Sequence, residues 1–160
     1  MGNILSYIYP FLTTKEERIS PYLLITGESN KKFELKIDDE EDEIYSNKYN
    51  AIIEIRSCND VELDLKDLIV DGNSNHNVKE NGLVKVKDRN NASACILICN
   101  CTNITIKNGY LLNAKNRIFI AHCKGNVILE NIKISTSEHE DVALIDIDNE
   151  NIVLNNCEYF

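Results

Sequence analysis

The segment CTNITIKNG at residues 101–109 places a short alternating apolar run between two asparagines. Two later segments repeat the arrangement, GNVILENIK at residues 125–133 and ENIVLNNCE at residues 150–158. Their equivalent apolar positions are Ile104, Val127 and Ile152, which lie 23 and 25 residues apart. An earlier segment supplies Leu63, 41 residues before Ile104, an interval that we interpret as close to two repeats. Self-similarity at this period indicates a solenoid.

The apolar runs are too short for helices, are rich in β-branched residues and alternate with polar residues. Each repeat holds three such runs separated by turns, and strands this short need neighbours stacked in parallel to bury their apolar face. The sequence therefore predicts an all-β chain, a short right-handed parallel β-helix of about four to five three-sided coils at residues 51–160. Residues 73–93 fit the repeat poorly, and we interpret them as one irregular coil with a protruding loop.

The residues before position 51 are predicted to form an N-terminal extension or cap. Residues 1–22 are an apolar segment, and residues 23–50 contain two strand-like runs, Leu23–Thr26 and Phe33–Ile37, followed by an acidic loop. That loop, residues 38–43, lacks the spacing of a calcium-binding EF-hand, and solvation explains its composition more simply.

Asparagine recurs on both sides of the central run of each coil. It tolerates left-handed backbone conformations, and stacked asparagines can hydrogen-bond from coil to coil. We therefore predict a structural corner ladder. Its members are Asn103, Asn126 and Asn151 at the opening corner, and Asn108, Asn131 and Asn156 at the closing corner. In the first repeat Glu62 and Asp67 take these places. Cys58, Cys101 and Cys123 recur near the preceding corner of successive repeats and are predicted to form a second stack.

The net charge and the cysteine pattern exclude some classes of partner and ligand. The net charge of −9 argues against nucleic acid, because phosphate contacts need a basic surface. The six cysteines lie among apolar residues, as buried free thiols do, and Cys99-Asn-Cys101 lacks the two-residue spacer of a zinc site. We expect no metal and no cofactor. No stretch has the length of a membrane-spanning helix.

The first six residues, MGNILS, fit the N-myristoylation pattern, with Gly2 as the acylated residue. The apolar side chains that follow could support an acyl chain at a bilayer, or could cap the open end of the β-helix. These residues are Ile4, Leu5, Tyr7, Tyr9 and Phe11. One myristoyl chain binds membranes only marginally, so reversible attachment is expected.

The phrases DLIVDGN at residues 67–73 and CTNITIKNG at residues 101–109 resemble the pectate-lyase-like superfamily of right-handed β-helices. That resemblance implies a right-handed β-helix for residues 51–160. Members of the superfamily range from polysaccharide lyases to viral adhesion proteins. The segment RIFIAHC at residues 117–123 is more weakly similar to tubulin-binding cofactor C-like domains. The activating arginine of that family would fall near Phe119 or Ala121, neither of which can replace it.

Paired carboxylates are the chemistry that a pectin-degrading relative would need. The best local candidates are Asp146 and Asp148, which alternation places on one face of a strand. A solvated face explains them more simply, and His76, His122 and His139 form no catalytic motif. We therefore expect no enzyme.

These observations lead to three alternative hypotheses for the function. The first is a non-catalytic interaction or structural protein, cytoplasmic and peripheral to a membrane if acylated, that binds a protein partner, the membrane surface or both. The second is a carbohydrate-binding or polysaccharide-lyase-related module, secreted or on a cell or virion surface. The third is a cofactor C-like regulator of a small GTPase. The apolar C-terminal coil also predicts a homo-oligomer formed through that coil.

Overall fold

A computed structural model describes residues 22–36, 51–72, 83–85, 94–112, 114, 116–136 and 143–160. The predicted acylation site Gly2 and the apolar residues Ile4, Leu5, Tyr7, Tyr9 and Phe11 lie outside this part of the chain, as does the acidic run at residues 38–43. His76 and His139 also lie outside it.

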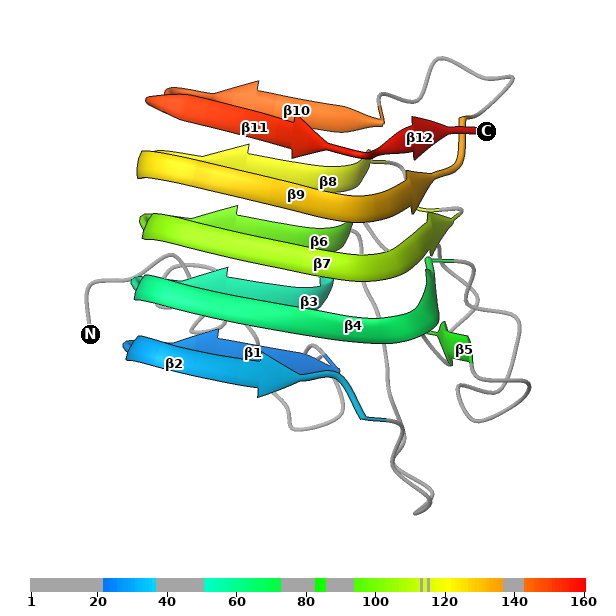
Figure 1. Cartoon of the computed structure of the whole chain (residues 1–160), viewed down its shortest axis with the longest axis horizontal. Helices are drawn as coiled ribbons and strands as arrows, with labels where there is room; N and C mark the ends of the chain where they lie inside the picture. The colour runs from blue at the N-terminus through cyan, green and yellow to red at the C-terminus, as the bar shows by residue number, and fades with distance from the viewer. Residues whose placement is uncertain are drawn as a thin grey trace, which may run out of the picture.

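The described residues form only β-strands, and every strand pairing is parallel. One sheet has the order β1-β3-β6-β8-β10 and the other β11-β9-β7-β4-β2, and Figure 1 shows the strands stacked in layers from the N-terminal coil to the C-terminal coil. The chain is a parallel β-solenoid of about four turns, which confirms the predicted fold class. The strands are β1 Leu23–Thr26, β2 Ser29–Glu34, β3 Ala51–Arg56, β4 Asn59–Asp71, β5 Leu83–Lys85, β6 Ala94–Cys99, β7 Thr102–Leu112, β8 Asn116–Ala121, β9 Lys124–Ile134, β10 Leu144–Ile147, β11 Asn151–Asn155 and β12 Glu158–Tyr159.

The long strands β4, β7 and β9 each bend partway and so contribute to two faces of the coil (Figure 1). Residues with left-handed backbone lie within them, at Asp67 (φ 59°), Asn108 (φ 62°) and Asn131 (φ 53°). After the bend, β5 pairs with β4 and β12 pairs with β9. Each complete coil therefore has three sides, as its three apolar runs predict.

The core consists of columns of apolar side chains that repeat from coil to coil. In the β1-β3-β6-β8-β10 sheet, Ile25, Ile55, Ile98 and Ile120 stand one above another and are buried. Val61, Ile104 and Val127 form the matching column of the second sheet. Burial of each such side chain contributes about 1.5–3 kcal/mol, so the columns are the main source of stability.

The register predicted for the first repeat is wrong by two residues. Val61, and not Leu63, pairs with Ile104, so the opening corner holds Asp60 where Glu62 was predicted. The cause is an irregularity between Asp64 and Leu68, where the buried Leu65 occupies the space beside Gly109.

The interval between the first two repeats is one coil with an insertion, and not two coils. Strand β4 pairs directly with β7, and β3 pairs directly with β6, which leaves no room for an intervening layer. Of residues 73–93, only Leu83–Lys85 lies in the described part, and it forms the predicted strand, β5, against Ile69–Asp71.

The solenoid already includes Leu23, which lies well before the predicted boundary at residue 51. β1 pairs in parallel with β3, and β2 with β4, so both strand-like runs of the predicted extension belong to the first coil. Ile25 and Leu35 of this coil are buried.

Candidate functional site

The opening corners of successive coils are joined by a ladder of amide hydrogen bonds. Asn151 donates from Nδ2 to Asn126 Oδ1 (2.8 Å), and the backbone N of Asn126 donates to Asn103 Oδ1 (3.1 Å). Asn103 in turn donates from Nδ2 to Asp60 Oδ1 (3.2 Å). At the opening corner of the fourth coil the left-handed residue is Gly125 (φ 63°), where an added Cβ would lie 2.1 Å from Asn103 Oδ1. Asn126 is therefore an extra residue, and neither Asn126 nor Asn151 has the left-handed backbone of Asn103.

The closing corners carry a second ladder. Asn156 donates to Asn131, Asn131 donates to Asn108 (3.2 Å), and Asn108 donates to Asp64 Oδ1 (3.2 Å). The backbone N of Lys66 also donates to this carboxylate, and the hydrogen bonds and nearby lysines lower the pKa of Asp64 despite some desolvation. Both ladders end on an aspartate, so these side chains hold the coils together.

The corner that precedes the opening corner carries a column of buried thiols, Cys58, Cys101 and Cys123. Cys101 Sγ accepts a hydrogen bond from the backbone N of Cys58 (3.5 Å), and each thiol also donates to backbone carbonyls. A hydrogen bond from Cys101 lowers the pKa of Cys123, and the same contact raises that of Cys101.

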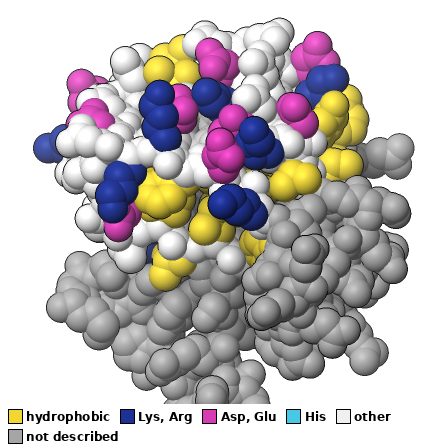
Figure 2. All heavy atoms as spheres, turned by 60° about the horizontal axis from the view of Figure 1, so that its bottom comes forward, with side chains coloured by type: hydrophobic (Ala, Val, Ile, Leu, Met, Phe, Trp, Pro, Cys, Tyr) yellow, Lys and Arg dark blue, Asp and Glu magenta, His cyan; other side chains and the backbone are white. Residues whose placement is uncertain are grey.

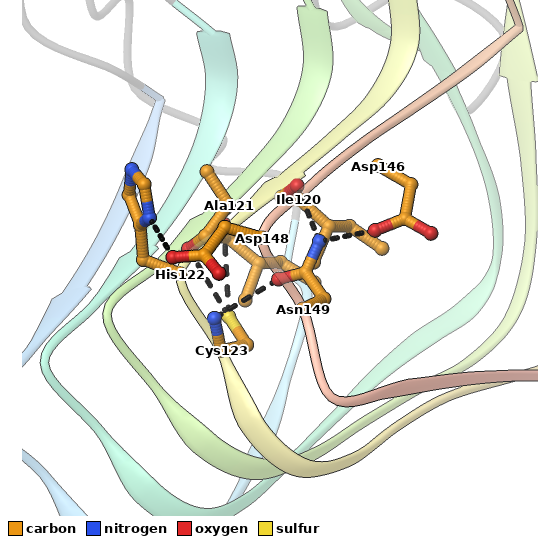
Figure 3. Close-up of polar contacts among 8 residues, drawn as sticks. Ile120, Ala121, His122, Cys123, Asp146, Asp148 and Asn149 are labelled. Carbon is orange, nitrogen blue, oxygen red and sulfur yellow. Dashed lines mark hydrogen bonds and ion pairs between the residues drawn. The ribbon is translucent and has the colours of Figure 1, made fainter.

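Asn149 of the last coil takes the next position after Cys123 at this corner, and Figure 3 shows its contacts with Cys123, Ile120 and Asp146. Its Oδ1 accepts from the backbone N of Cys123 (2.9 Å), the role that Cys101 Sγ has toward Cys58 two coils lower. Its Nδ2 donates to the carbonyl of Ile120 (2.8 Å) and to Asp146 Oδ1 (2.7 Å). Asn149 is a site residue that was not predicted, although its alignment with three cysteines at the same corner is a signal present in the sequence.

Asp146 and Asp148 do not share a strand face, contrary to prediction. β10 ends at Ile147, and Asp148 lies in the corner with left-handed backbone (φ 55°), which breaks the alternation. Asp148 Oδ2 lies 2.9 Å from Nδ1 of the exposed His122 (Figure 3). Asp146 instead pairs in register with Ile120 and so takes the next position of the inward isoleucine column.

The outer faces of the sheets carry mixed charge. Figure 2 shows Lys and Arg side chains interspersed with Asp and Glu on the surface in view, and half-exposed pairs such as Lys107–Glu62 (3.3 Å) join neighbouring coils. Two shallow grooves follow the asparagine ladders. A groove of about 520 Å³ lies over β2, β4, β7 and β9 and includes Lys32, Thr105 and Ile128. A second, of about 300 Å³, includes Tyr110, Asn131 and Glu158.

Two arginines lie buried where the sequence suggested no ion pair. Arg56 Nε donates to Glu54 Oε2 (3.1 Å), both side chains are 1% exposed, and Arg56 Nη1 and Nη2 have no hydrogen-bond partner among the described residues. Burial raises the pKa of Glu54, while the charge of Arg56 and its hydrogen bond oppose that rise. Arg117, from the RIFIAHC segment, donates from Nη1 to the carbonyl of Ala114 (2.9 Å) and is likewise buried. Its role is structural, as are the positions of Phe119 and Ala121 within β8.

The last coil lies at the end of the stack of described strands. In the first coil the inward Ile25 and Leu35 are buried and the outward Leu24 is exposed, whereas in the last coil four large apolar side chains are exposed. The exposed residues are Ile147, Leu154, Tyr159 and Phe160. Residues 143–160 include four carboxylate side chains (Asp146, Asp148, Glu150 and Glu158) and no Lys or Arg.

Within the described ranges, no three His, Cys, Asp or Glu side chains are grouped to hold a metal ion. That part of the chain also contains no helix with the length and apolar character to cross a membrane.

No family model matches the chain, and no curated protein matches it. Among solved structures, a "putative glycosyl hydrolase" of Parabacteroides merdae matches with 15% sequence identity and a TM-score of 0.40. The match covers 72% of this chain and 64% of that one, so the chain spans less than two thirds of the length of that structure.

Proposed function

We propose that this chain is a non-catalytic interaction protein, a β-solenoid whose open last coil binds a protein partner. The observation that carries the proposal is the contrast between the two ends: Ile25 and Leu35 are buried in the first coil, whereas Leu154 and Tyr159 are 42% and 50% exposed in the last. An edge strand with exposed apolar neighbours is a surface on which another strand can pair.

Four aspartates of the described coils support a structural and not a catalytic role. Glycoside hydrolysis needs two carboxylates that face one bond of the substrate. Here Asp60 and Asp64 accept from the asparagine ladders, and Asp148 pairs with His122. Asp146 accepts from Asn149. Each is engaged by a neighbouring corner residue.

We further propose that Gly2 is myristoylated and that the acyl chain holds the protein reversibly at a cytoplasmic membrane face. The support is the MGNILS pattern and the apolar residues behind it. The acidic composition supplies no second electrostatic anchor, so attachment is weak and the partner determines where the protein stays.

The experiment is expression of the full chain in a eukaryotic cell, beside a Gly2→Ala control, with intact-mass measurement and flotation on lipid vesicles. The proposal expects a myristoyl increment and partial flotation, both lost in the control. An unmodified chain would remove the membrane part of the proposal. Cleavage of polygalacturonate or pectin by the purified protein would overturn the non-catalytic part.

A carbohydrate-binding function has one observation in its favour. The groove of about 300 Å³ brings the Tyr110 ring beside the amides of Asn108 and Asn131, and aromatic rings with amides are suited to bind sugars. Lys133, however, lies over that ring, with Nζ 5.3 Å from its centroid, and competes for the same face. Binding on a glycan array that is lost in Tyr110→Ala would favour this alternative.

A further inference from the structure

The open edge of the last coil presents hydrogen-bonding backbone groups as well as apolar side chains. β10 is the end strand of its sheet among the described residues. Its carbonyls at Ala143 and Ile147 accept from the backbone N of Ile118 and of His122 in the coil below. In a parallel strand, alternate residues face opposite neighbours, so the backbone groups of Leu144 and Asp146 face the open side.

Asp146 also occupies a position that every lower coil fills with isoleucine. Ile25, Ile55, Ile98 and Ile120 precede it in the inward column. Asn149 engages its Oδ1, and its Oδ2 has no partner within the described residues. A strand added to β10 in register would place one of its side chains directly over this carboxylate.

That geometry selects the chemistry of the added strand. An apolar side chain over Asp146 would bury the carboxylate without a counter-charge, which is costly. A lysine or arginine would pair with it, and the three other carboxylates of this coil, unbalanced by any Lys or Arg, would attract a basic segment.

We propose that the open edge of the last coil binds a basic strand of a partner protein, with a lysine or arginine of that strand paired to Asp146. This inference deepens the proposed interaction function, because it names the surface and the chemistry of the partner. The main-chain hydrogen bonds supply affinity, and Asp146 supplies specificity by rejecting apolar strands.

A second copy of this chain fits the same edge poorly. If its first coil continued the stack, Ile25 would lie over Asp146, and Lys31, which shares a column with Val61, would lie over Ile152. Each charge would then face an isoleucine. If two last coils met face to face, four carboxylates of each copy would confront four of the other. Inward charges on edge strands are a known protection against such stacking.

The test uses the full chain and a seven-residue peptide of alternating lysine and valine, with a glutamate–valine peptide as the reversed-charge probe. Binding is measured by calorimetry for wild type, Asp146→Asn and Glu158→Gln. Asn keeps the acceptor for Asn149 but removes the charge, and Glu158→Gln removes one charge from the same coil at an outward position. Sedimentation velocity of wild type and Asp146→Ile reports self-association, and circular dichroism checks that each variant is folded.

Wild type should bind only the lysine peptide, Asp146→Asn should bind it about tenfold more weakly, and Glu158→Gln should change the affinity by less than about twofold. Wild type should sediment as a monomer, and Asp146→Ile should associate. Equal binding by Asp146→Asn, no binding of the lysine peptide, or association of wild type through this coil would each overturn the inference. A partner that binds this coil without a basic strand would overturn it as well, yet would leave the proposed interaction function standing.

Discussion

Asn131 in β9 donates a hydrogen bond from its Nδ2 to Oδ1 of Asn108 in β7, 3.2 Å away and one coil lower. Asn156 repeats the contact from above, so the Asn131 side chain both donates and accepts. Its backbone is left-handed (φ 53°). The same residue thus turns the chain and fastens it to two neighbouring coils.

Replacing Asn131 separates these two roles. Asn131→Ala loses both rungs and forces a left-handed alanine, and should lower the free energy of unfolding by about 2–4 kcal/mol. Asn131→Gly loses the rungs but keeps the backbone freedom, and should cost about 1–2 kcal/mol. Urea denaturation measures both. Equal losses for the two variants would show that the backbone conformation carries no cost.

Removing one partner of the buried pair Glu54–Arg56 should destabilise the fold strongly, whereas replacing both partners should destabilise it little. Arg56→Met leaves a buried carboxylate without its counter-charge and should destabilise the fold by about 3–5 kcal/mol. The double variant Glu54→Leu, Arg56→Met should recover most of that loss, since neither charge then needs compensation. If the double variant is no more stable than Arg56→Met, the ion pair is not the source of the effect.

The same pair predicts a pH dependence. Burial raises the pKa of Glu54 above its ordinary value of 4.5, with Arg56 opposing the rise. A carboxyl group with a raised pKa in the folded state favours folding fully below its unfolded pKa, and this contribution is lost as pH rises through the folded value. Arg56→Met removes the opposing effect, so its unfolding free energy should fall more steeply above pH 4.5 than that of wild type. Parallel pH profiles would contradict this.

The contact between Gly109 and Leu65 predicts a packing coupling. A Cβ at Gly109 would lie 2.5 Å from Leu65 Cδ1 and 2.8 Å from Leu65 Cβ. Gly109→Ala should therefore cost about 1–3 kcal/mol through overpacking. Leu65→Ala removes the Cδ1 contact and leaves only the Cβ contact, so the double variant should lose less than the sum of the two single losses in a double-mutant cycle. Strict additivity would mean that the strain is relieved elsewhere.

Thiol reactivity should follow access more than acidity. Cys157 is partly exposed, whereas the other five cysteines are buried. Burial raises the pKa of Cys95 to about 12 and that of Cys99 to about 11. Although the Cys101 contact lowers the pKa of Cys123, that thiol is only 2% exposed. Iodoacetamide should label Cys157 first in the native protein, and Cys157→Ser should abolish the fast phase; rapid labelling of Cys123, read by peptide mapping, would contradict this.

The sequence predicts the stack because the residues of each core column recur at the same place in every repeat. Ile104, Val127 and Ile152 share one register, and asparagines flank them. The coil that contains β4 was misplaced because Leu65 folds inward and both Lys66 and Asp67 have left-handed backbone, which adds residues that spacing alone cannot assign.

Alternation alone did not predict the inward position of Asp146. It assigned Asp146 and Asp148 to one outer face, whereas the strand ends at Ile147, between them. The inward position becomes readable once LIDI at residues 144–147 is set below RIFIA at residues 117–121, where the aspartate falls under Ile120. The burial of Glu54 and Arg56 could not be predicted in this way, because alternation gives them an outward position on β3, where charged side chains are usually solvated.

Hydrogen–deuterium exchange of the full chain, with and without the lysine–valine peptide, tests the proposed binding surface most directly. The amides of Leu144 and Asp146 face the open edge and should exchange quickly in the free protein. The peptide should slow exchange in residues 143–148 and leave β2 and β4 unchanged. Unchanged exchange at β10, or protection confined to the grooves over β2, β4 and β7, would contradict it.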